Sequence, residues 1–343
     1  MTKLKGHVLP QNKRQSNFEL LRILSMFLIV MHHIAVHGEY GEVISVNYAV
    51  LRFFEIGGKI GVNLFVLISG YFMVNSEFKF KKLVYLAAEI IFYSLLYFII
   101  LLSCGKVTYS VDFLQATLFP LLSNSYWFAS AYIITYCLSP YLNSVIKNTT
   151  KKQLIYLIVF LLILQCYVPF TFGPNFFSNV GWFLTLYLIA AYLKVYPVKI
   201  TDSNKILLPS AILTYLAIAL LNIFTDEDFW LINHAVCTLC SVAAFCSFKN
   251  FNIGQNKVIN AVAKTTFGVY LIHDNIWIRH ILWVELLKCP THAQNNLFII
   301  FAVVAVLLVF ALCMLIDIIR ELIFTLLSNL AAKAARKLQV KTI

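Results

Sequence analysis

The sequence predicts an all-α fold, a polytopic integral membrane helical bundle of about ten transmembrane helices with both chain ends in the cytoplasm. Composition predicts the membrane, because 61% of the residues are hydrophobic and only 12% are charged, against about 25% charged in soluble domains. Long, mostly apolar runs such as 83–102 and 297–316 predict helices, since barrel strands would alternate over about ten residues. The placement of lysines and arginines predicts the orientation.

A membrane-spanning helix needs about 20 mostly apolar residues. Such spans are expected at residues 18–36, 57–74, 83–102, 126–146, 153–169, 180–196, 206–224, 231–248, 262–280 and 296–319. The eighth and ninth are interrupted by polar residues. The sequence has no internal repeat and no connection long enough for a soluble domain. Residues 1–343 are therefore expected to form one membrane-embedded domain, with cytoplasmic tails at 1–17 and 320–343.

Basic residues gather in the two tails and in alternate connections, which hold all but six of the 27. The other six are Arg22, Arg52, Lys59, Lys106, Arg279 and Lys288. This bias requires an even number of spans and places both ends inside. The net charge of +12 is therefore interpreted as a topology signal and as contact with anionic membrane lipid, with no nucleic-acid partner expected. The eight cysteines are scattered, and the lone CxxC at Cys237 and Cys240 predicts no metal site.

The first span carries ionisable residues, which are costly in lipid and are functional candidates. Arg22 and His33 are eleven positions apart, so they share one helix face about 16 Å apart. Histidine can take a proton at neutral pH, and arginine suits a phosphate or carbonyl oxygen. The adjacent His32 points about 100° away, and Glu19 lies about one turn from Arg22. The alternative interpretation is that Arg22 reaches back to the inner interface and His33 only marks the outer one.

The second span opens with Gly57 and Gly61, a GxxxG spacing that favours close helix packing. Asn63 follows, and its amide needs partners in hydrocarbon. His273 and Asp274 lie in YLIHDN of the ninth span, where a satisfied core histidine is the alternative. Tyr126 and Trp127 open the fourth span, either as interfacial anchors or as a sugar-stacking surface. The histidines expected at the surface are His37, His280 and His292.

The ordered segments NFELLRILSMFLIVMHH, GVNLFVLISGYF, SYWFASAYIITYCLSPYLN, GWFLTLYLIAAYLK and FGVYLIHDN resemble acyltransferase family 3. The hallmark of that family is a basic residue, ten residues and then histidine in the first span, which Arg22 and His33 match. Ten spans and a cytoplasmic N-terminus also fit. The sequence departs from the family at Asn63, where aspartate is common, and after the second span, where lysines replace arginines. Lysine attracts phosphate as a point charge without the bidentate fork.

The resemblance implies a membrane O-acyltransferase, most simply an O-acetyltransferase, in the plasma membrane of a bacterial cell. The donor would be acetyl-CoA or another acyl-CoA on the cytoplasmic side. The acceptor would be a hydroxyl of an extracytoplasmic or lipid-linked polysaccharide. His33 would deprotonate that hydroxyl or briefly carry the acyl group. No metal is expected.

The resemblance also distributes roles among the candidates. The catalytic candidates are His33, Arg22, His32, Glu19 and His273. The residues expected to hold the donor's phosphates are Arg22, Lys79, Lys81 and Lys82. The residues expected to contact substrate are Asn63, Tyr126, Trp127 and Asp274.

Two other classes of protein remain open from the sequence. A transporter or flippase of a polysaccharide precursor could use Arg22 and His33 as gating charges or as a proton relay. A membrane module of a sensor or racemase is the third interpretation, and the absence of a following soluble domain counts against it. An enzyme would leave an alkali-labile ester on the glycan in an acyl-CoA-dependent way, whereas a flippase would not.

Overall fold

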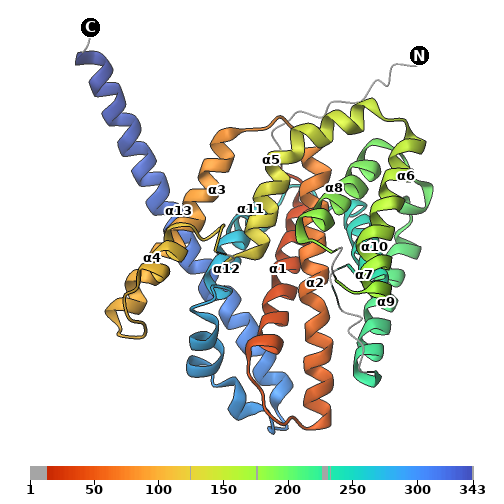
Figure 1. The fold of residues 1–343 in the computed structure, drawn as a ribbon, viewed down its shortest axis with the longest axis horizontal. Coiled ribbons are helices and arrows are strands. Elements are labelled where there is room, and N and C mark those ends of the chain that lie inside the picture. The colour runs from red at the N-terminus through yellow and green to blue at the C-terminus, as the bar shows by residue number, and fades with distance from the viewer. Residues whose placement is uncertain (1–13, 124, 175–176, 226–230, 232, 342–343) are drawn as a thin grey trace.

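The computed structural model describes residues 14–341 except 124, 175–176, 226–230 and 232. Among these residues the regular secondary structure is entirely helical (Figure 1). The α-helices are α1 (Ser16–His37), α2 (Ser45–Met73), α3 (Phe80–Ser103), α4 (Val111–Leu118), α5 (Trp127–Asn148), α6 (Lys151–Leu162), α7 (Val168–Phe172), α8 (Asn179–Val195), α9 (Asn204–Phe224), α10 (Ala235–Lys249), α11 (Lys257–Val262), α12 (Thr266–His273) and α13 (Phe298–Lys341). Shorter turns are the π-helices Ile163–Tyr167 and Ile281–Leu286 and the 3₁₀-helices Lys199–Asp202, Ala263–Thr265 and Cys289–His292.

Six helical segments of the described chain are long and apolar enough to cross a membrane, so the protein is a membrane protein. They are α1, α2, α3, the continuous α6–α7 segment Lys151–Phe172, α9, and α13 as far as Leu330. The apolar helices α8 and α10 have only 17 and 15 residues. The expected ninth span, 262–280, is divided among α11, a 3₁₀ turn and α12, which ends at His273. The count of about ten spans and the orientation of the two ends therefore stay predictions.

The antiparallel pair α1 and α2 forms the centre of the bundle, and α2 also contacts α8, α9 and α10 (Figure 1). The close packing predicted from the GxxxG spacing is confirmed. A Cβ atom added to Gly61 would lie 2.5 Å from the carbonyl oxygen of Ser25, and one added to Gly57 would lie 3.0 Å from that of Leu28. The α2 helix begins at Ser45, twelve residues before the expected start. Arg52 and Glu55, an ion pair at 2.6 Å, had interrupted the apolar pattern there.

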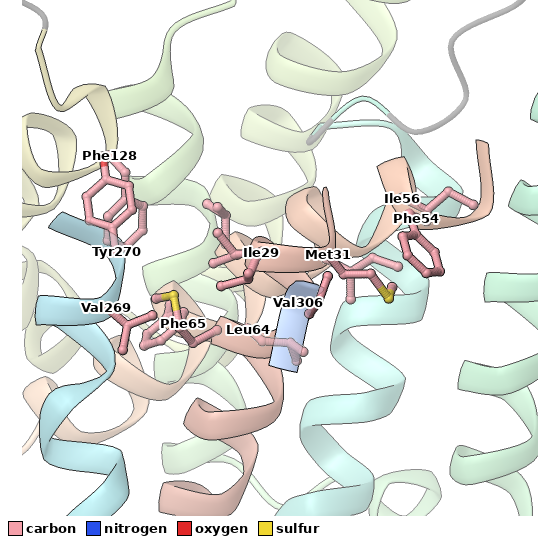
Figure 2. Close-up of a cluster of buried hydrophobic side chains, with 14 of the residues drawn as sticks. Ile29, Met31, Phe54, Ile56, Leu64, Phe65, Phe128, Val269, Tyr270 and Val306 are labelled. Atoms are coloured by element: carbon pink, nitrogen blue, oxygen red, sulfur yellow. The ribbon is translucent and has the colours of Figure 1, made fainter. Parts of the chain in front are cut away.

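Apolar side chains from α1, α2, α5, α12 and α13 meet around this pair. Figure 2 shows members of the cluster: Ile29 and Met31 of α1, Leu64 and Phe65 of α2, Phe128 of α5, Val269 and Tyr270 of α12, and Val306 of α13. Their burial fixes the last turn of α12 against α1. This contact positions the candidate site described below.

The helix α13 continues through residue 320, where the sequence had predicted a cytoplasmic tail, and its last part extends beyond the bundle (Figure 1). Arg320 is buried rather than in a tail. Its Nη2 lies 3.1 Å from Oε1 of Glu89 in α3, and its Nε lies 2.8 Å from Oδ1 of Asp317. The hydroxyl of Tyr93 also donates to Asp317. These carboxylates explain the difference, because a buried guanidinium is retained where charge and hydrogen-bond partners are supplied.

Candidate active site

His33 lies on the wall of a cavity of about 150 Å³ between α1, α2, α5 and α12. The α1 residues on this wall include Met26, Ile29, His33 and His37, spaced three and four positions apart. Arg22 lies four positions before Met26, so the same stripe of α1 continues to it. The common face that the sequence predicted for Arg22 and His33 therefore leads from the start of α1 into this cavity.

A chain of hydrogen bonds that ends at His33 determines which of its two ring nitrogens carries the proton. The carbonyl oxygen of Val269 can only accept, so Nδ1 of His273, 2.5 Å away, donates to it. In a neutral His273 ring Nε2 is then an acceptor, and Nδ1 of His33, 2.8 Å from it, donates to it. Nε2 of His33 is consequently the nitrogen that keeps its lone pair. Both rings are buried, and the contacts that orient them come from α12.

The carboxylate of Asp274 faces three cationic or basic groups at the end of α12. Its Oδ1 lies 3.5 Å from Nε2 of His33, 3.6 Å from Nε2 of His37 and 3.7 Å from Nε of Arg279. Asp274 is 4% exposed, so these charges interact through a medium of low dielectric. His37 thus lines the cavity, and its side chain is 22% exposed, so the expected surface position is correct only in part. The signal was its four-residue spacing from His33, which places both on one helix face.

His32 also lines the cavity, but α2 holds it. Its Nδ1 lies 2.6 Å from the carbonyl oxygen of Glu55. A Cβ on Gly58 would lie 2.3 Å from Cγ of His32, so only glycine leaves room for this ring. Lys59 follows directly on α2, and its ammonium nitrogen lies 5.5 Å from the ring centre of Trp127. Lys59 and Arg279 are cavity residues that sequence reasoning did not select, because tertiary packing alone brings them to His33.

The residues expected to contact substrate do not all lie in one place. Tyr126 is 1% exposed; its hydroxyl donates to the carbonyl of Leu271 at 3.0 Å and accepts from Asn275 at 2.7 Å. It therefore braces the end of α12. Trp127 lines the cavity. Asn63 is fully buried, and its Oδ1 accepts from the indole of Trp182 at 2.9 Å. Substrate contact by Tyr126, Trp127, Asn63 and Asp274 stays a prediction.

The other end of the α1 stripe carries the arginine. Nε of Arg22 is 3.9 Å from Oε2 of Glu19, which also lies 3.8 Å from Arg14. Nε of Arg22 is buried and has no hydrogen-bond partner among the described residues. The hydroxyl of Tyr132 in α5 lies within electrostatic range of both Arg22 and Lys82. Helices α1, α3 and α5 therefore bring Arg22 and Lys82 to one region.

The remaining lysines are more exposed. The side chains of Lys79 and Lys81 face outward at the start of α3, whereas the ammonium of Lys82 lies 4.8 Å from the ring centre of Tyr136. Lys194 of α8, not selected from the sequence, lies 4.2 Å from the ring centre of Tyr71 in α2. Donor binding by Arg22, Lys79, Lys81 and Lys82 stays a prediction, and Lys194 joins the same end of the bundle.

His33, His37 and Asp274 have ligand atoms within 4.8 Å of one another, a spacing that a metal ion could use. The surrounding charge opposes it, because Arg279 faces the same carboxylate oxygen and Lys59 lines the same cavity. A divalent cation would have to displace or repel these groups. We assign no metal here, and its expected absence stays a prediction.

A larger cavity of about 730 Å³ adjoins the first and shares Lys59 and Trp127 with it. Its other walls come from the α6–α7 segment, the start of α8, and Leu231, Asn233 and His234. The shared residues make the two cavities neighbours across one boundary.

The family model described as the acyltransferase domain, that of acyltransferase family 3, matches residues 15–318. This range is nearly the whole chain and contains every residue of the small cavity. No curated protein matches the chain, and no solved structure matches it.

Proposed function

The chain belongs to the acyltransferase domain family, and from this premise we propose that it is a membrane O-acyltransferase with His33 as its base. The observation that carries the proposal is the contact chain from Val269 through His273 to His33. It directs the lone pair of the His33 Nε2 away from His273, as a general base requires. We propose acyl-CoA as the donor and a hydroxyl group of a surface or lipid-linked glycan as the acceptor.

In the proposed reaction the acceptor hydroxyl attacks the thioester carbonyl carbon while Nε2 of His33 takes its proton. The tetrahedral intermediate collapses with cleavage of the C–S bond. The new C–O bond completes the ester, and the CoA thiolate takes the proton back from His33. Atoms and charge balance without any further reactant.

The surroundings of His33 suit this proton transfer. The negative charge of Asp274, whose Oδ1 lies 3.5 Å from Nε2, favours the imidazolium that forms when His33 takes the proton. Arg279 and Lys59 bring positive charge to the cavity where the oxyanion develops. His273 is a positioning residue, because it acts through His33.

The size of the small cavity supports a short acyl group. Its volume is about 150 Å³, which leaves room for an acetyl thioester and the hydroxyl group that attacks it. We therefore propose acetyl-CoA as the donor, entering from the Arg22 end. Its extended pantetheine arm would follow the α1 stripe for about 16 Å to His33.

The resemblance of the sequence supports the acceptor and the location. We propose a polysaccharide or lipid-linked glycan on the outer side of a bacterial plasma membrane. The His33 end of α1 would then face outward and the Arg22 end inward, in agreement with the basic residues of the alternate connections.

Acetyl transfer can be tested with vesicles that contain the chain and acetyl-CoA labelled in the acetyl group. We expect label on surface glycan that mild alkali releases, and none with His33→Gln at equal protein level. A protein that only transports glycan would move it across the membrane without labelling it. Such a result would overturn the proposal.

A further inference from the structure

The larger cavity has the composition of a binding site rather than of a packing defect. Its aromatic wall consists of Trp127, Tyr167, Phe170 and Phe177. The polar residues that line the same cavity are Lys59, Asn179, Asn233 and His234. A volume of about 730 Å³ is within the range of ≈ 300–1,000 Å³ typical of small-molecule sites. Apolar walls with a few polar groups are also typical of them.

One wall of this cavity is built by an irregular turn of helix. Pro169 has no N–H, so it leaves the carbonyl of Gln165 without its usual helical donor. The π-helix Ile163–Tyr167 accommodates this break, with the N–H of Val168 bonded to the carbonyl of Ile163. Asn233, which precedes α10, donates its side-chain amide to the carbonyl of Gln165 at 2.5 Å. Two distant segments are thus joined, and π-turns of this kind are frequent at functional sites.

The boundary between the two cavities is formed by Lys59 and Trp127, which line both. The ammonium of Lys59 over the indole ring holds this pair together. A molecule in the larger cavity therefore lies next to the cavity that contains His33. A group that passes this boundary reaches the reaction centre without crossing another helix.

We propose that the larger cavity is the acceptor chamber, that it binds a short stretch of sugar rings, and that Lys59 and Trp127 form its threshold toward His33. This inference rests on the proposed acyl-transfer function for the role of the threshold. Sugar rings fit the walls because their apolar faces stack on aromatic rings while their hydroxyls bond to amide and imidazole groups.

Two other occupants fit less well. An alkyl chain would cover the side-chain amide of Asn179 without offering it a hydrogen bond, at a cost in free energy. A strongly anionic group would meet only one cationic side chain among the described residues of the wall, Lys59. A chain of sugars can stack on the aromatic rings and form hydrogen bonds with the polar groups.

Filling the chamber tests the proposal. Ala235 lies on the wall of the larger cavity and is exposed. Ala235→Trp should raise the KM for acceptor glycan at least tenfold and leave the KM for acetyl-CoA unchanged. Ala217→Trp, on the exposed surface of α9 and outside the chamber, is the matched control and should leave both constants unchanged. Equal acceptor constants in the two variants would overturn the chamber.

A binding measurement separates this inference from the proposed function. An oligosaccharide fraction, prepared from the surface of the cells that carry the gene, should raise the Tm of the full-length protein and of Ala217→Trp but not of Ala235→Trp. That pattern without acetyl transfer would support the sugar chamber while refuting the acyltransferase. Stabilisation by dodecanol and not by the oligosaccharides would overturn the sugar assignment.

The threshold has its own test. Trp127→Ala should raise the acceptor KM in the same way as filling the chamber, and Trp127→Phe should restore most of it because a ring remains. Wild-type behaviour of both variants would remove Trp127 from the threshold.

Discussion

His33 and Arg22, which lie toward opposite ends of one face of α1, differ in how many neighbouring polar groups contact them. At His33, the ring of His273 is 2.8 Å away and the carboxylate of Asp274 is 3.5 Å away. At Arg22, the nearest acid is Glu19 at 3.9 Å, and Nε of the guanidinium has no hydrogen-bond partner among the described residues. The histidine end is held by neighbouring groups, whereas the arginine end has binding capacity left for a ligand.

This difference matches two kinds of chemical task. A base must be held in one orientation, and fixed neighbours reduce the reorganisation needed during reaction. A site for a flexible phosphate-bearing donor needs positive charge from several directions, and Arg22, Lys82 and Lys194 come from three helices. The four predictions below test the contrast, beginning with the largest effect.

Replacing His33 should have the largest effect. We expect His33→Gln to lower kcat by about 10²–10⁴-fold, the usual contribution of a positioned general base. His32→Gln should keep most of the activity, because His32 is bonded to the backbone of α2. Rates of acetyl transfer in membranes with matched protein levels decide this. Loss of activity in His32→Gln with an active His33→Gln would assign the base to the other histidine.

Arg22 should act on donor binding. We expect Arg22→Met to raise the KM for acetyl-CoA by about 10–100-fold, since a hydrogen bond to a charged group contributes about 1.5–3 kcal/mol. Arg22→Lys should recover part of this through charge alone. Initial rates at varied acetyl-CoA and fixed acceptor provide the measurement. A changed acceptor KM with an unchanged donor KM would place Arg22 elsewhere in the reaction.

The close packing of α1 against α2 fixes the positions of both Arg22 and His33. A Cβ on Gly61 would meet the carbonyl oxygen of Ser25 at 2.5 Å, so we expect Gly61→Ala to destabilise the protein by about 1–3 kcal/mol. Gly41→Ala is the control, because its added atom would meet nothing within 4 Å. Thermal unfolding of the two purified variants compares them. Equal stability would show that the helices can separate without cost.

The exposed lysines should have the smallest effect. We expect Lys82→Gln to raise the KM for acetyl-CoA by about two- to fivefold and Lys81→Gln by less, since exposed charges contribute about 1 kcal/mol or less. The effect should decrease as salt is added. Donor kinetics at two ionic strengths test it, and a larger effect from Lys81 would reverse the assignment of Lys82 to the donor region.

Local periodicity was sufficient to predict part of the fold and site. It predicted the common face of Arg22 and His33 and the packing role of Gly57 and Gly61, because both depend on one helix and its nearest neighbour. It also could have included His37, which lies one helical turn beyond His33.

The rest depended on tertiary structure. Lys59 and Arg279 reach the cavity from α2 and from the residues after α12, and no sequence spacing relates them to His33. The ninth expected span is broken because α12 ends at His273, so its polar residues face a cavity instead of continuing a helix. Arg320 was assigned to a tail because hydropathy does not reveal partners from a distant helix.

The ion pair between Glu89 and Arg320 joins a helix made early in synthesis to the last helix made. The ribosome delivers α3 to the membrane long before α13, so the nascent bundle holds a carboxyl group whose cation has not yet been made. A buried charge without its partner is strongly destabilising. The arrival of the last helix therefore supplies the cation that Glu89 needs and completes the bundle.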